Sequence, residues 1–174
     1  MIDTQASERF MAAPWLGEID QESKRAILSA LVEARAPAGA ILLAQDQPND
    51  HLSFLIEGTA SVERILANDR REVITRLGAP AVFGSTSFFR PQPPSVSVRA
   101  TSDVWLLSLY HPAHEALRAA DPRAAESLAV AVLRAVSERF DLMDQYIVDF
   151  LARHSHEPEK LSEWARFRSR MFEE

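Results

Sequence analysis

The chain has 174 residues, 47% of them hydrophobic and 25% charged, so it can bury a core and is too apolar for a disordered segment. Its formal net charge of -6 disfavours nucleic acid and anionic membranes as partners. The absence of cysteine excludes disulfides, thiolate metal sites and cysteine nucleophiles. The first residues lack a signal-peptide pattern, and no apolar stretch approaches the roughly 20 residues needed to span a bilayer. These features predict a cytoplasmic globular protein.

Residues 1–35 are predicted to form a helical lead-in. An apolar stretch runs from Phe10 to Leu16, and apolar residues then recur at helical spacing between Ile19 and Ala34. Asp20, followed three residues later by Ser23, is predicted to cap the start of this second helix. We expect the apolar faces of both segments to pack on the core of the domain.

Residues 36–110 change to short apolar runs separated by turn residues. Candidate strands fall at 41–43, 52–56, 59–66, 73–77 and 104–109, with a hairpin at Asn68-Asp69. Short strands at this spacing predict an antiparallel barrel or sandwich.

Two stretches of this region carry a family pattern. The segment PAGAILLAQDQPNDHLSFLIEGTASV resembles the turns and strands of cyclic-nucleotide-binding domains, and FGSTSFFRPQPPSVSV, at 83–98, resembles their phosphate-binding cassette without a gap. Gly39, Gly58, Gly78 and Gly84 fall where that family turns its chain, while Asp46 replaces a usual glycine and tolerates the left-handed conformation. The resemblance covers roughly residues 10–150. It implies a mainly β protein with flanking helices, a jelly-roll-like antiparallel β-roll followed by a long C-terminal dimerisation helix.

The two residues that contact the nucleotide in this family are absent from the cassette. Ser85 stands where a glutamate accepts a hydrogen bond from the ribose, and Pro94 stands where an arginine pairs with the cyclic phosphate. A guanidinium supplies a charged, forked donor, whereas proline supplies neither charge nor a backbone N–H. We therefore expect the chain to keep the fold and to have lost binding of cyclic AMP and cyclic GMP.

A modified ligand pocket is the alternative. Arg90 lies four residues before Pro94, and Arg99 lies on the following strand, so either guanidinium could face a phosphate while serines supply hydrogen bonds. A ligand would then act by shifting the C-terminal helix between two positions. The candidate pocket residues are Phe83, Gly84, Ser85, Thr86, Ser87, Arg90, Pro94, Ser95, Ser97 and Arg99.

Residues 111–152 are predicted to be helical, with Pro112 near the start of one helix and Asp121-Pro122 at the start of the next. From Ala129 onward, apolar residues alternate at spacings of four and three, which is a heptad pattern that suits a helical partner. Because the family pairs two protomers through this helix, we predict a homodimer. The seam consists of Leu133, Val136, Phe140, Met143, Ile147 and Phe150.

Residues 153–174 form a tail with a short amphipathic pattern. Leu161, Trp164, Phe167 and Met171 are its apolar positions, and we predict that they dock on a protein partner, with Trp164 as an anchor. The tail is too short for the helix-turn-helix domain of the family's transcription regulators, so DNA binding is not expected.

No reactive constellation stands out in the sequence. The histidine pairs His111/His114 and His154/His156 have no cysteine beside them, so neither a metal nor another cofactor is expected. No nucleophile, base and acid form a recognisable catalytic arrangement in the sequence, which argues against an enzyme. The sequence favours a non-catalytic regulatory or scaffolding protein that acts through protein contacts, with a ligand sensor as the alternative.

Overall fold

The computed structural model describes residues 2–66, 70–153, 162, 165–167 and 169. The chain divides into two compact units, Met1–Leu133 and Arg134–Glu174. The strands are β1 (Val32–Ala36), β2 (Ile41–Leu43), β3 (His51–Glu57), β4 (Thr59–Ile65), β5 (Arg71–Gly78), β6 (Ala81–Phe83), β7 (Ser97–Ala100) and β8 (Val104–Tyr110). The helices are α1 (Thr4–Met11), α2 (Gln21–Ser29), α3 (Ser85–Phe89), α4 (His111–Ala120) and α5 (Pro122–Arg153), with a 3-10 turn at Pro14–Leu16.

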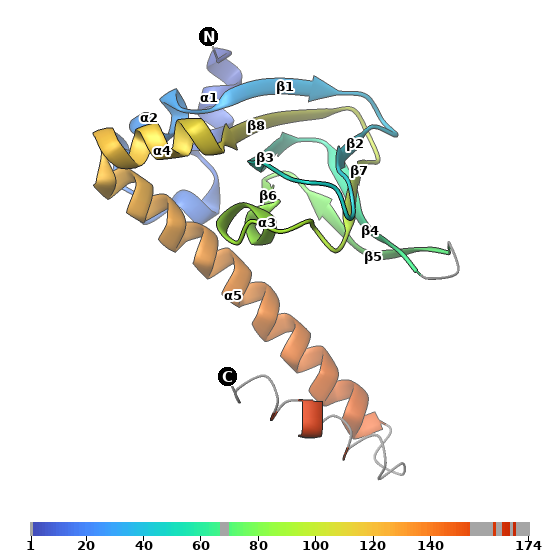
Figure 1. Cartoon of the computed structure of the whole chain (residues 1–174). Helices are drawn as coiled ribbons and strands as arrows, with labels where there is room; N and C mark the ends of the chain where they lie inside the picture. Colours follow the sequence, from blue (N-terminus) through green and yellow to red (C-terminus); the bar gives the residue numbers. More distant parts are fainter. Residues whose placement is uncertain (1, 67–69, 154–161, 163–164, 168, 170–174) are drawn as a thin grey trace. The chain divides into compact units, whose positions relative to one another are not determined.

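Two four-stranded sheets form the body of the first unit (Figure 1). Their strand orders are β1-β8-β3-β6 and β2-β7-β4-β5, and every pairing is antiparallel. Alternate side chains from both sheets meet in one apolar core, as expected for two facing sheets. Its buried residues are Leu43, Leu55, Ala60, Phe83, Val98, Ala100, Val104 and Leu106. The predicted β-roll is confirmed.

The N-terminal segment agrees with its prediction in one part and differs in another. Asp20 caps α2, and its carboxylate accepts a hydrogen bond from the Ser23 backbone N–H at 2.9 Å, as predicted. The prediction that the helix continues to Ala34 is wrong, because α2 ends at Ser29 and Val32–Ala36 form β1. The backbone of β1 pairs with β8 along its whole length. This long-range pairing overrides a helical spacing that was only a local preference.

An aromatic cluster joins the N-terminal helices to β3. The Phe10 and Phe54 rings are fully buried, with centroids 5.3 Å apart in an edge-to-face arrangement. Trp15 stacks on Phe54 with centroids 5.0 Å apart. Aromatic pairs in these geometries add to the stabilisation from apolar burial. The predicted packing of this segment on the core is therefore confirmed.

Left-handed backbone residues mark the turns of the roll. Gly39, Gly58 and Gly84 have φ values of 88°, 88° and 81°, and Asp46 has a φ of 60°, as predicted for a residue in a glycine position. Gly78 has an ordinary φ, so the turn there does not depend on the freedom of glycine.

Gly58→Ala is expected to lower the free energy of unfolding by about 2–3 kcal/mol. The left-handed conformation costs an alanine roughly 1–2 kcal/mol, and crowding adds about 1 kcal/mol or more. The crowding arises because a Cβ at Gly58 would lie 2.3 Å from the Asp103 carbonyl oxygen. Urea denaturation measures the change. Gly39→Ala, with the same φ and open space around it, should lose only the roughly 1–2 kcal/mol of the left-handed conformation, and Gly78→Ala almost nothing. Equal losses at Gly39 and Gly58 would contradict the clash.

Helices α4 and α5 follow β8. Pro112 lies in the first turn of α4, as predicted, and the Asp121 carboxylate accepts a hydrogen bond from the Ala124 backbone N–H at 3.0 Å at the start of α5. Helix α5 is 32 residues long. In the part of the chain that the structure describes, no helix is both long and apolar enough to cross a membrane.

Candidate functional site

The cassette runs from the end of β6 through α3 to β7. Gly84 precedes α3 in the left-handed conformation, and its carbonyl oxygen accepts a hydrogen bond from the Phe88 backbone N–H at 2.9 Å. A Cβ at Gly84 would lie 2.9 Å from the His51 carbonyl oxygen on β3. Glycine therefore lets α3 begin in close contact with the sheet.

The two departures from the family pattern occupy buried positions in this cassette. Ser85 is the first residue of α3 and is 5% exposed. Pro94 is also buried, and its carbonyl oxygen accepts a hydrogen bond from the Asp46 backbone N–H at 2.9 Å, which fixes the cassette loop to the turn between β2 and β3. At neither position does the site have a side chain that can pair with a charged ligand group.

The two arginines that could replace the missing guanidinium have different surroundings. Arg90 is exposed at the end of α3. On β7, the Arg99 Nε lies 3.3 Å from a Glu63 carboxylate oxygen, and another guanidinium nitrogen donates a hydrogen bond to the Gly39 carbonyl oxygen at 2.8 Å. Its neighbours Val98 and Ala100 belong to the core, so Arg99 lies on the opposite face of the strand. Its guanidinium is already engaged within the sheet.

Glu63 is a buried charged residue that the sequence did not reveal. It is 6% exposed, accepts a hydrogen bond from the Ser61 hydroxyl at 2.7 Å, and lies 3.6 Å from Arg71 Nε. Burial alone would raise the pKa of the Glu63 carboxyl, but the hydrogen bonds from Ser61 and Arg99 outweigh it and hold the pKa below its ordinary value. The Glu63–Arg99 pair is thus an ionised part of the sheet.

The serines of the predicted pocket have separate partners. Ser87 is buried, and its hydroxyl accepts a hydrogen bond from Asn49 Nδ2 at 3.0 Å, whereas the hydroxyl of Ser97 accepts one from the Gln45 backbone N–H at 3.0 Å. Thr86 and Ser95 are exposed, and Phe83 lies in the core. The cassette residues are therefore adjacent along the chain but do not direct their polar atoms to one point.

Asn49 is a residue of the site that the sequence reasoning missed. Its Nδ2 also donates to the His51 carbonyl oxygen at 2.8 Å, and its Oδ1 is buried with no hydrogen-bond partner among the described residues. The signal available in the sequence was an asparagine directly after Pro48, in a loop before a strand. Its side chain links β3 to α3.

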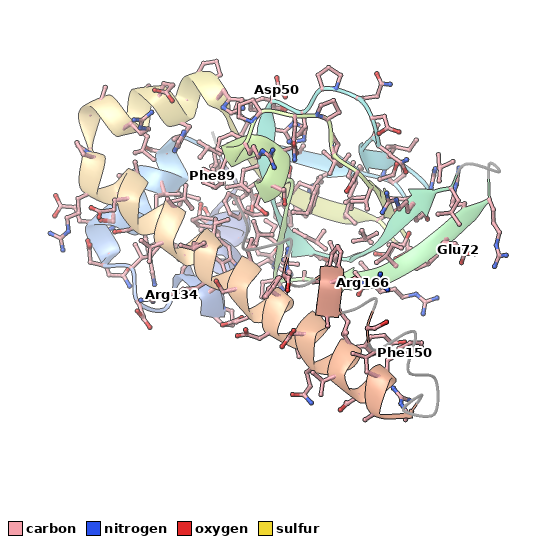
Figure 2. All side chains as sticks on the ribbon, turned by 60° about the horizontal axis from the view of Figure 1, so that its bottom comes forward. Asp50, Glu72, Phe89, Arg134, Phe150 and Arg166 are labelled. Carbon is pink, nitrogen blue, oxygen red and sulfur yellow. The ribbon has the colours of Figure 1, made fainter. Side chains whose placement is uncertain are left out.

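Aromatic and histidine rings join α3 to α4. The Phe88 ring stacks on His111 with centroids 4.3 Å apart. The His114 ring lies edge-to-face with Phe88 and with Phe89, at centroid distances of 5.3 Å and 5.9 Å. Beside these rings, a groove of about 790 Å³ lies between α3, α4 and the start of α5. Phe89, labelled in Figure 2, is one of the residues that line it. Within the described ranges, no group of three or more His, Asp or Glu could hold a metal ion, and His154 and His156 lie outside them. The ring contacts of His111 and His114 are with Phe88 and Phe89.

Acidification below about pH 6.5 is expected to destabilise the protein through His114. Burial, partly offset by Glu115, lowers the pKa of His114 below its ordinary value of 6.5. The unfolded chain then binds the proton more tightly, so stability present above pH 6.5 is lost as the pH falls toward the lowered value. Urea denaturation at about pH 7.5 and about pH 5.5 measures this loss. His114→Gln should remove most of the difference between the two pH values. An unchanged difference in that variant would assign the pH dependence to another group.

The seam residues all lie on α5. Leu133 is 63% exposed, Ile147 is half-buried, and Val136, Phe140, Met143 and Phe150 are exposed. Leu142, which the heptad pattern did not include, is 72% exposed. Of the predicted tail residues, Phe167 is exposed, whereas Leu161, Trp164 and Met171 lie outside the described residues.

Comparisons with known proteins agree with this geometry. The sequence profile described as "Cyclic nucleotide-binding domain" matches residues 33–121. A cyclic nucleotide-gated potassium channel of Rhizobium etli is 30% identical over 122 residues, which are 70% of this chain and 33% of the channel. A CRP-like cAMP-activated global transcriptional regulator of Mycobacterium tuberculosis is 26% identical over 115 residues, which are 66% of this chain and 50% of the regulator. The crystal structure of a cyclic nucleotide-binding domain from Methylobacillus flagellatus superposes with a TM-score of 0.74 and 23% identity, covering 83% of each chain.

The sheets, the left-handed glycines and the α3 cassette define a cyclic-nucleotide-binding type of β-roll. The chain belongs to the cyclic nucleotide-binding domain family, whose profile matches about half of it. It spans from 33% to 50% of the lengths of the two relatives described above. The resemblance inferred from the turns and the cassette is confirmed.

Proposed function

We propose that the chain is a non-catalytic regulatory or scaffolding domain that does not bind cyclic AMP or cyclic GMP in the manner of its family and that acts through protein contacts. The observation that carries the proposal is the cassette itself, where Ser85 and Pro94 are buried at the two positions that contact nucleotide in the family. Arg99, the nearest replacement on a strand, is engaged with Glu63.

Energetics support the loss of ordinary binding. Removing one side of a buried, hydrogen-bonded charge pair costs roughly 2–5 kcal/mol, or about thirtyfold to several thousandfold in affinity. Without the arginine, the site lacks the charge-assisted contact to the phosphate. The serine at position 85 cannot compensate, because its hydroxyl is short and uncharged.

Calorimetric titration of the purified chain with cyclic AMP, cyclic GMP and cyclic di-GMP tests the proposal. We expect no heat of binding from any of them at micromolar ligand. Micromolar binding of one nucleotide would contradict the proposal and favour the second candidate, a ligand sensor with a modified pocket. Two features favour that candidate: the exposed Arg90 at the end of α3, and the Asn49 Oδ1, which has no hydrogen-bond partner among the described residues. Arg90→Ala would then reduce the affinity.

The protein contacts that we propose are of two kinds. The first is a homodimer through the seam of α5, which presents apolar side chains at heptad spacing. The second is a protein partner bound through Leu161, Trp164, Phe167 and Met171, with no role for DNA. Apolar side chains exposed along one helix are typical of a helix-packing interface.

A further inference from the structure

Strand β1 is an open edge of its sheet. In the order β1-β8-β3-β6 it is the first strand, and among the described residues it pairs with β8 alone (Figure 1). Val32 is 51% exposed, and Ala34 and Arg35 are also exposed. An unpaired strand edge presents a row of backbone donors and acceptors that can pair with another strand.

Space is available beside this edge. A groove of about 780 Å³ lies between α2 and β1, lined by Arg25 and Leu28 from the helix and by residues 32–35 from the strand. No proline interrupts β1 itself, and Pro37 follows directly after its last residue. An added strand therefore meets a continuous five-residue edge.

Two residues of opposite charge lie at equal distances from the centre of β1. The strand reads Val-Glu-Ala-Arg-Ala from Val32 to Ala36, so Glu33 and Arg35 flank Ala34 on one face of the sheet. In an antiparallel pair of two such strands centred on Ala34, Glu33 of each copy would lie opposite Arg35 of the other. Directly opposite residues of unlike charge stabilise an antiparallel pair.

Both side chains contact the same tryptophan, and the second carboxylate oxygen of Glu33 accepts a hydrogen bond from the Asp3 backbone N–H at 2.8 Å. The Arg35 guanidinium carbon lies 3.9 Å from the centre of a Trp105 ring, and Trp105 Nε1 donates a hydrogen bond to Glu33 Oε1 at 2.8 Å. Stacking engages the face of a guanidinium and leaves its in-plane N–H groups free to donate. Arg35 forms no ion pair in the part of the chain that the structure describes. Among the described residues, no carboxylate therefore pairs with this positive charge.

We infer that β1 pairs with β1 of a second copy of this chain, in an antiparallel register centred on Ala34, to form one continuous sheet across a two-fold axis. Such an interface is isologous, because the same residues contribute from both copies. Five residues bury far less surface than a standard stable interface, so we expect the association to be weak and to be detected only at high protein concentration. This contact uses none of the α5 seam and joins chains independently of it.

Cysteine cross-linking tests the register directly, because the natural chain contains no cysteine. The residue at the two-fold centre faces its own copy, with Cβ atoms about 4.5–5.5 Å apart, so Ala34→Cys should form a disulfide-linked dimer with oxidised glutathione. Val32→Cys, on the same exposed edge, would lie far beyond the roughly 7 Å limit from its copy and should remain monomeric on a non-reducing gel. Ile74→Cys, exposed on the other sheet, controls for random collision. Equal linkage of all three variants, or none at Ala34→Cys, would overturn the inference.

Charge exchange provides a second measurement on the cysteine-free chain. Arg35→Glu places like charges opposite each other twice, and sedimentation velocity should show roughly tenfold weaker β1 association. The exchanged variant Glu33→Arg/Arg35→Glu restores both pairs and should return to within about threefold of the natural chain. Thermal unfolding monitors whether each variant folds. Folded Arg35→Glu with unchanged association would also overturn the inference, and the α5 seam is intact in every variant.

Discussion

The variant Ser85→Glu/Pro94→Arg is expected to bind cyclic AMP, whereas the natural chain is expected not to bind it. The pair restores the two charged contacts that the family uses, within a β-roll whose turns and α3 cassette are in place. Restoring a buried charge-assisted contact should strengthen affinity by roughly 2–5 kcal/mol, or about thirtyfold to several thousandfold. Calorimetric titration of both proteins measures the difference.

The structure also defines the controls for this experiment. Pro94 contributes a carbonyl oxygen to the Asp46 hydrogen bond, and an arginine keeps that acceptor, so the loop should remain attached. The uncharged variant Ser85→Gln/Pro94→Gln has similar bulk and should not gain binding. Urea denaturation shows whether both variants fold, since Ser85 has little space around it. A folded charged variant that binds no better than its uncharged counterpart would contradict the assignment of these two positions.

Phe140→Glu should convert the proposed α5 dimer to a monomer. The side chain lies in the middle of the heptad seam, and a two-fold pairing would bring two uncompensated carboxylates into an apolar contact. An unpaired charge in a buried interface costs roughly 3–5 kcal/mol, which weakens association at least about a hundredfold. Light scattering after size exclusion gives the mass directly.

The same helix supplies a matched control for the seam. Leu142 is more exposed than Phe140 and lies two residues further along, on another side of the helix. Leu142→Glu should therefore leave the mass within error of the natural chain. Equal effects of the two substitutions, or a natural chain that is monomeric at all concentrations, would contradict a dimer built on this seam. Arg35→Glu leaves α5 unchanged and separates this interface from pairing through β1.

Local chemistry determined the parts of the fold that could be predicted. Glycine at positions 39, 58 and 84 and aspartate at position 46 are tolerated in the left-handed conformation, so their order along the chain identified the turns of the roll. Asp20 could be identified as a cap because its partner Ser23 is three residues away. The departures at Ser85 and Pro94 were equally visible, because a cassette is contiguous in the sequence.

Tertiary structure decided the features whose partners are distant in the chain. Residues 32–34 have helical spacing, yet they form β1 because β8, some seventy residues later, supplies the backbone partner. Arg99 was a candidate for the ligand pocket, but its partner Glu63 is separated from it by 36 residues and lies beside it only when β4 pairs with β7. The stacking of Phe88 on His111 and the hydrogen bond from Asn49 to Ser87 also join separate elements. Sequence therefore determined the family and the two departures from its cassette pattern, Ser85 and Pro94, and folding determined which charged groups pair within the sheet.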